Sequence, residues 1–194
     1  MTIKTISEII FEEFCCSNNL SCEKIIESNQ SSTPDYRVIL NAETVIVEVK
    51  QIDRDGEFKF TEGVSSRIVG THVRAKINEA RKQVKVASNE RRPAILLIYN
   101  NLDPLQMFGT EQHDFISAMY GELTVVLNLT KHNITDSYHG RNQSLRQGKN
   151  TSFSAVGCLY RTNKGSAIRI YENVFAENKL NYSSLPKCIE TIQI

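Results

Sequence analysis

Residues 33–52 read TPDYRVILNAETVIVEVKQI, and this stretch decides the fold. The runs YRVIL and ETVIVEVKQI are rich in β-branched and aromatic residues, so they predict two strands joined near Asn41–Ala42 as a hairpin. The second run is unusual because Glu48 and Lys50 interrupt an otherwise apolar strand. Since side chains alternate along a strand, this acid and this base stand on the same face.

The start of the first strand brings a second acid to the same place. If the two runs pair antiparallel around their short connection, Asp35 lies across from Glu48. Two carboxylates and a lysine then converge. The alternative is a solvated hairpin face in which Asp35 only shapes a turn. A strand that also carries Ile46 and Ile52 is, however, a costly place for unpaired charge, which favours a functional reading.

The flanking sequence predicts an α/β fold, with a central mixed β-sheet flanked by helices and a single domain over residues 1–194. Helical spacing of Ile6, Ile9, Ile10 and Phe14 predicts a first amphipathic helix. The apolar run AILLIYN predicts a central strand buried on both faces. The expected elements are helices at 4–17, 73–88 and 111–120 and strands at 94–100 and 123–129. Residues 53–72 are expected to form an irregular, mobile or functional loop, residues 130–152 a long surface loop, and FSAVGCLYR with SAIRIYEN a hairpin across TNKG.

The motif resembles that of the PD-(D/E)xK nuclease superfamily, which has the restriction-endonuclease-like fold. The likeness rests on Pro34-Asp35, twelve intervening residues, and Glu48-Val49-Lys50. By the order of its elements it covers the first 100 residues, and the second half matches by class only.

The resemblance implies a metal-dependent nuclease that hydrolyses phosphodiester bonds, with DNA as the expected substrate. It implies Asp35 and Glu48 as ligands of Mg²⁺, for which Mn²⁺ can substitute, and the Val49 backbone carbonyl as a third ligand. It implies Lys50 as the residue that orients or activates the attacking water. Two alternatives stay open: an inactive relative that serves as a nucleic-acid-binding or protein-interaction module, and a structural α/β protein.

Many members of the superfamily also carry a glutamate on the first helix that reaches the metal. Glu8, Glu12 and Glu13 compete for this role here. Glu12 is favoured because it lies at the margin of the apolar stripe. The alternative is a solvated acidic face.

Several branches of the superfamily add a glutamine from the helix after the hairpin, a role that Gln83 could fill. The tyrosine that often follows four residues later is replaced by Ala87. Gln51, directly after the motif lysine, is the alternative polar group.

The charge balance does not by itself indicate a nucleic-acid-binding protein. The net charge is +1, from 23 basic and 22 acidic residues. Basic residues could still contact phosphates without reading bases, although such residues often only solvate a surface. The basic candidates are Arg74, Lys76, Arg81, Lys82, Lys85, Arg141, Arg146 and Lys149.

No secretory signal or membrane segment is recognised, so we expect a cytoplasmic protein with reduced cysteines and no membrane partner. The oligomeric state is left open, and a homodimer is one of the options.

Overall fold

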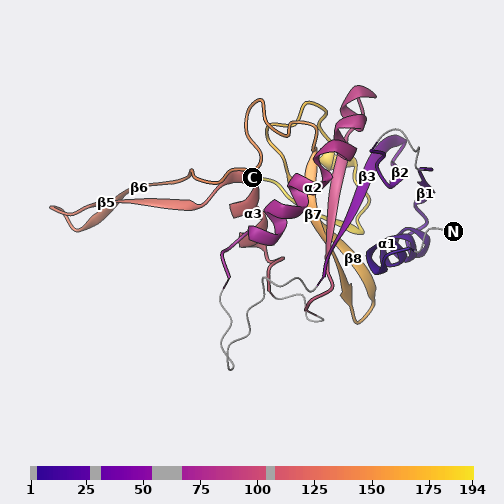
Figure 1. Ribbon diagram of the computed structural model, residues 1–194, viewed down its shortest axis with the longest axis horizontal. Helices are drawn as coiled ribbons and strands as arrows, with labels where there is room; N and C mark the ends of the chain where they lie inside the picture. Colours follow the sequence, from indigo (N-terminus) through magenta and orange to yellow (C-terminus); the bar gives the residue numbers. More distant parts are fainter. Residues whose placement is uncertain (1–3, 27–31, 54–66, 104–107) are drawn as a thin grey trace.

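A seven-stranded mixed sheet forms the middle layer of the protein (Figure 1). The computed structural model describes residues 4–26, 32–53, 67–103 and 108–194. The strand order is β1-β2-β3-β4-β7-β8-β9, in which β3, β4 and β7 are mutually parallel and the β1–β2, β2–β3 and β7–β8 pairs are antiparallel. The strands are β1 Ser21–Lys24, β2 Tyr36–Leu40, β3 Glu43–Ile52, β4 Ala94–Asn100, β7 Ala155–Thr162, β8 Gly165–Glu172 and β9 Ile189–Ile192.

Helices cover both faces of this sheet, so the predicted mixed α/β class is confirmed. Helix α1 (Ile6–Ser17) packs on one face, where Phe11 and Phe14 join Val47 of β3 in one apolar core. Helices α2 (Thr71–Asn89) and α3 (Gln112–Tyr120) pack on the other face in a second core, which includes Ile46 of β3. Alternate residues of β3 therefore serve different cores, as strand geometry requires.

The buried stripe of α1 differs from the predicted one. The buried side chains are Ser7, Ile10, Phe11, Phe14 and Cys15, whereas the predicted core residues Ile6 and Ile9 are exposed. The isoleucines at helical spacing predicted the buried stripe, but the helix is rotated so that its first turn meets β3. The helix begins at a capping box of Thr5 and Glu8, which was not predicted.

The predicted β2–β3 hairpin is confirmed, together with its register. Val38 lies opposite Val45, and Leu40 lies opposite Glu43. Asn41 and Ala42 form the two-residue turn with φ values of 46° and 72°. Such left-handed values suit the twist of a tight hairpin and are uncommon for alanine.

The predicted helix and central strand after the hairpin are also confirmed. The stripe residues Val73, Ile77, Ala80, Val84 and Ala87 are all fully buried along α2. Strand β4 is buried at every position and runs parallel to β3, so α2 is the crossover between them. The predicted loop 53–72 lies largely outside the described residues, which resume at Arg67.

The region after α3 departs from prediction. The apolar stretch forms β5 (Leu123–Asn128), but it does not enter the main sheet. It pairs with β6 (Asn133–His139), a strand inside the segment predicted as a loop, in a ribbon that projects from the body (Figure 1).

The β7–β8 hairpin is confirmed, whereas the short edge strands β1 and β9 were not predicted. Among the described helices, none is long and apolar enough to cross a membrane.

Candidate active site

Asp35, Glu48 and Lys50 meet at the mouth of the β2–β3 hairpin. Asp35 directly precedes β2 and faces Glu48: its backbone N–H donates to Glu48 Oε2 at 3.2 Å. The Val49 N–H in turn donates to Asp35 Oδ2 at 2.8 Å. The Lys50 ammonium lies 2.7 Å from Glu48 Oε1. The structure thus brings together the three residues that the sequence singled out.

The carboxyl group of Glu48 is buried, with its side chain 1% exposed. Burial and the neighbouring charge of Asp35 raise the pKa of Glu48 to about 7, although Lys50 and the Asp35 N–H favour its ionised form. Burial also raises the pKa of Asp35, against the hydrogen bond from Val49 and the charge of Lys50. When these two acids are ionised, the nearby positive charge therefore does not fully offset the cost of burying their negative charges.

Lys50 is the cation that partly offsets these two acids. Burial acts to lower its pKa, but the charges of Glu48 and Asp35 raise it above the ordinary lysine value. Lys50 is consequently charged near neutral pH. When both acids are ionised, this group of three carries a net negative charge.

On α1, Glu8 acts electrostatically on Asp35, whereas the favoured Glu12 is bonded to other groups. The charge of Glu8 contributes to the raised pKa of Asp35, and Glu8 Oε1 lies 2.5 Å from the Lys24 ammonium. Glu12 instead accepts a hydrogen bond of 2.9 Å from the Tyr36 hydroxyl and pairs with Lys4 at 2.6 Å. Glu13, the third candidate, is exposed.

The two glutamines have different surroundings. Gln51 Oε1 accepts a hydrogen bond of 2.9 Å from the Ser7 N–H, so Gln51 joins the end of β3 to the start of α1. Gln83 is half-buried on α2, and its Oε1 is buried without a hydrogen-bond partner in the described structure. Within the described part of the chain, Gln83 forms no hydrogen bond with Asp35, Glu48 or Lys50, so its catalytic role stays a prediction. The same holds for the Val49 carbonyl as a ligand.

Two groups near the motif were not predicted. Lys24 of β1 pairs with Glu8, and its charge also acts on Asp35. Glu79 of α2 acts electrostatically on Lys50 while it pairs with Lys76 at 2.9 Å. Lys24 could not be found from the sequence, because a short polar edge strand shows no periodicity. Glu79 lies at the edge of the α2 stripe and could have been found from helical spacing.

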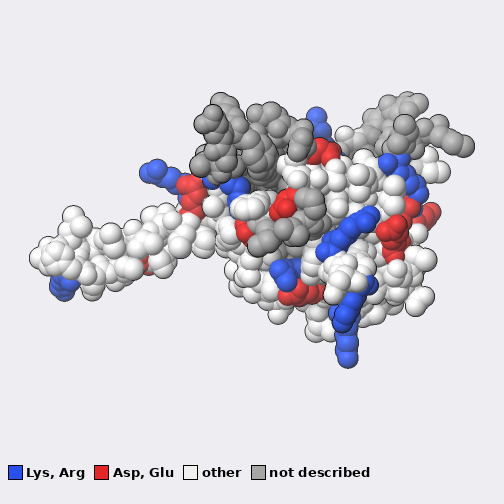
Figure 2. Space-filling view, turned by 90° about the horizontal axis from the view of Figure 1, so that it is seen from below, with Lys and Arg blue, Asp and Glu red and all other residues white. Residues whose placement is uncertain are grey.

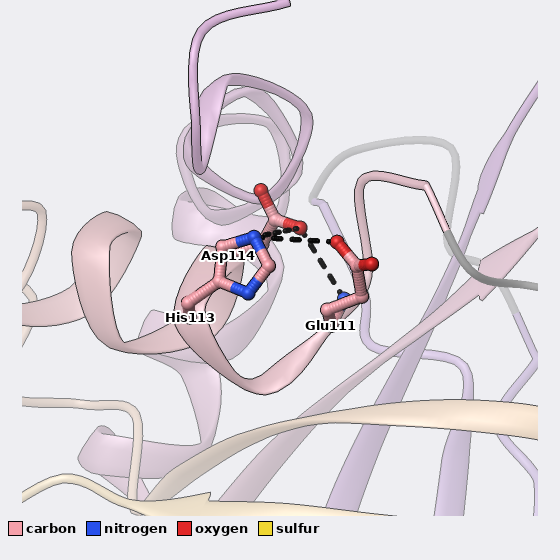
Figure 3. A group of neighbouring side chains, drawn as sticks. All are labelled: Glu111, His113 and Asp114. Carbon is pink, nitrogen blue, oxygen red and sulfur yellow. Dashed lines mark hydrogen bonds and ion pairs between the residues drawn. The ribbon is translucent and has the colours of Figure 1, made fainter.

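A second polar cluster lies at the start of α3 (Figure 3). Among the described residues, Glu111, His113 and Asp114 form a group of three side chains whose potential metal-ligating atoms lie within 4.8 Å of one another. Arg67 already occupies this cluster: its guanidinium pairs with Asp114 and donates to Glu111 Oε2 at 2.6 Å.

This arrangement is better suited to a structural role than to metal binding. Burial acts to raise the pKa of Asp114, but hydrogen bonds from Arg67 and the Gly70 N–H lower it below its usual value. Asp114 is thus held as a carboxylate by protein donors. A metal ion here would be repelled by the guanidinium, so we assign the cluster to linking α3 with the start of α2.

Comparisons of the chain with protein-family models, with curated proteins and with solved structures gave no significant match.

Proposed function

We propose that this protein is a metal-dependent nuclease of the PD-(D/E)xK type, with a restriction-endonuclease-like core and DNA as its substrate. The observation that carries the proposal is the convergence of Asp35 and Lys50 on the buried carboxyl group of Glu48. The order helix, hairpin, helix and buried parallel strand over the first 100 residues supports the same reading.

The electrostatics of the site fit a divalent cation. Two carboxylates face one ammonium, and burial raises the pKa of both acids. A bound cation would compensate this excess negative charge, and carboxylate oxygens are the ligands that Mg²⁺ prefers. Asp35 and Glu48 would hold the ion, and Mn²⁺ could replace it. A bound ion of this kind stabilises charge on a scissile phosphate and lowers the pKa of its water.

The residues of the chain supply the remaining requirements. Lys50 presents a charged ammonium beside the carboxylates, where it can anchor a phosphate oxygen or orient a water molecule. Glu8 on α1 acts electrostatically on Asp35, and its carboxylate pairs with Lys24. Gln83 lies one helical turn beyond Glu79 on the same flank of α2, and Glu79 acts on Lys50. Because α2 runs antiparallel to β3, this spacing supports a location for Gln83 near the level of Glu48.

Some of the basic residues are available for phosphate contacts. Arg81, Lys82 and Lys85 are exposed on α2, as are Arg141 and Arg146 after the projecting ribbon. By contrast, Arg74 donates to the backbone carbonyls of Val69, Ser117 and Asn142, and Lys76 pairs with Glu79. The proposed DNA-binding surface therefore relies on the exposed set, of which the α2 residues are the principal part.

The test is a cleavage assay with linear, circular and single-stranded DNA and with RNA, in Mg²⁺, Mn²⁺ or EDTA. We expect the wild type to cleave DNA with Mg²⁺ or Mn²⁺, and Glu48→Gln and Lys50→Ala each to lose activity roughly a hundredfold or more. Matched controls are Glu43→Gln at the other end of β3 and Lys164→Ala in the β7–β8 turn. Absence of cleavage on every substrate, together with absence of Mg²⁺ binding by calorimetry, would refute the proposal. Mg²⁺ and DNA binding without cleavage would favour the inactive, nucleic-acid-binding alternative.

A further inference from the structure

The ribbon formed by β5 and β6, here called the arm, exposes an unusual amount of apolar surface. Its two strands pair antiparallel over Leu123–Asn128 and Asn133–His139, and each packs chiefly against the other (Figure 1). A two-stranded hairpin alone is marginally stable in water. The exposed large apolar side chains of the arm are Leu123, Val125, Val126, Leu127, Leu129, Ile134 and Tyr138.

These side chains are concentrated on one face of the arm. The register places Leu123, Val125, Leu127 and Ile134 on the same face, with a bulge on the β6 side between the partners of Val126 and Leu127. Their exposed fractions are 62%, 44%, 59% and 63%. The opposite face carries Thr124 and Asn128 beside Val126 and Tyr138. A strand pattern with one aliphatic face normally indicates that this face is covered.

The two strands of the arm stay paired down to its base, and the flanking residues are bonded to α3, where the Gly121 N–H donates to the Ser117 carbonyl at 3.1 Å. The Gly140 N–H donates to the Glu122 carbonyl at 3.1 Å, and the Glu122 N–H donates to the Arg141 carbonyl at 2.9 Å. His139 Nδ1 lies 2.7 Å from the Gly121 carbonyl. Figure 1 shows that the arm extends well beyond the sheet and helices. The arm therefore leaves the body as one paired ribbon, with its aliphatic face away from both cores.

We propose that the arm is a dimerisation element, and that its aliphatic face packs against the same face of the arm of a second copy of this chain. The lack of charge supports this choice. Lys131 and Asp136 are the only Lys, Arg, Asp or Glu residues in 123–139, and the arm is almost entirely white in Figure 2. Nucleic acid would require several cations here. An uncharged aliphatic face meets its own copy without electrostatic repulsion, and a two-fold axis closes the assembly.

The exposed area of the aliphatic face indicates a weak dimer. Complete burial of one aliphatic side chain removes roughly 60–120 Å² from water, so the four on this face, which are about half exposed, offer on the order of 200 Å². Interfaces between identical subunits are about 65% apolar, which implies a total near 300 Å² for each copy. This is below the range for stable specific interfaces, about 600–1,000 Å² for each partner, so we expect association that depends on protein concentration.

The test is the mass of the full chain in solution, measured by sedimentation from low to high micromolar concentration. We expect the wild type to change from monomer to dimer as the concentration rises through this range. The double variant Val125→Lys/Leu127→Glu places a cation and an anion on the aliphatic face, and we expect it to weaken the dimer roughly a hundredfold or more. The matched control Thr124→Lys/Asn128→Glu places the same charges on the opposite face and should remain a dimer.

A second variant addresses the folding of the arm itself. Residues 123–139 are replaced by Gly-Ser, which the close approach of Glu122 and Gly140 allows. We expect this variant to be a monomer whose body melts as a folded protein. A monomeric wild type overturns the proposal, whether or not its arm binds DNA or lipid vesicles. So does a dimer that survives removal of the arm, or a control that dissociates as readily as the double variant. None of these outcomes depends on cleavage activity, so the dimer and the nuclease proposal can fail separately.

Discussion

The buried acid Glu48 predicts an unusual response of stability to pH. Its folded-state pKa of about 7 lies above the ordinary value of 4.5, so the folded state binds this proton more tightly than the unfolded state. The stabilisation from this group is fully present below about pH 4.5 and is lost as the pH rises through about 7. The difference between the two pKa values corresponds to roughly 3 kcal/mol, at about 1.4 kcal/mol for each pH unit.

Glu48→Gln should therefore stabilise the metal-free protein at high pH. Glutamine keeps the shape and an acceptor for the Asp35 N–H but carries no charge. We expect the free energy of unfolding at pH 8 to rise by up to about 3 kcal/mol, and the gain to disappear near pH 5, where wild-type Glu48 is already protonated. For a chain of this size, such a gain raises the melting temperature by about 6–12 °C.

Urea unfolding at several pH values, with and without Mg²⁺, is the measurement. Mg²⁺ at about a hundred times its dissociation constant should stabilise the wild type at pH 8 by about 2.7 kcal/mol and should have little effect on Glu48→Gln. Glu43→Gln is the control and should show neither change. If Glu48→Gln is less stable than the wild type at pH 8, or if the difference between them is independent of pH, the assignment of Glu48 as an undercompensated buried acid is wrong.

Three further predictions concern residues around the site. Lys50→Ala should lower cleavage roughly a hundredfold while it retains Mg²⁺ binding in calorimetry, because both carboxylates remain; unchanged cleavage contradicts the role of this lysine. Glu8→Gln should weaken Mg²⁺ affinity more than Glu12→Gln, because Glu8 acts on Asp35 whereas Glu12 bonds to a tyrosine hydroxyl; the reverse order contradicts this geometry. Asp114→Asn should lower the free energy of unfolding in urea by about 3 kcal/mol, because it leaves the Arg67 guanidinium without its main partner. A decrease below about 1 kcal/mol contradicts the assignment of this cluster to linking α3 with the start of α2.

The hairpin and its acids could be predicted because their signals are local. Alternation along β3 and a two-residue turn determine which residues face each other, and both can be read from twenty consecutive residues. The α2 stripe is equally local, since Val73 through Ala87 repeat at helical spacing without interruption. The β2–β3 hairpin and the buried stripe of α2 could therefore be predicted without knowing which elements they pack against.

The errors arose where tertiary contacts decide the outcome. Ser7 is buried in α1, while Ile6 and Ile9 are exposed, because α1 is oriented by its packing on β3. Strand β6 was predicted as loop because NITDSYH is polar, and its pairing with β5 compensates for weak intrinsic preference. The sequence correctly indicated a strand in β5, but it could not show that this strand leaves the main sheet.

The choice between Glu8 and Glu12 illustrates how one such contact bears on the site. Gln51 follows the motif lysine and accepts the Ser7 N–H, so the end of β3 holds the first turn of α1. Glu8 is the next residue, and its carboxylate is fixed further by hydrogen bonds from Thr5 and by the ion pair with Lys24. Glu12 lies one turn farther from this attachment. The polar residue after the motif thus bonds to the first turn of α1, and Glu8 in that turn acts electrostatically on Asp35.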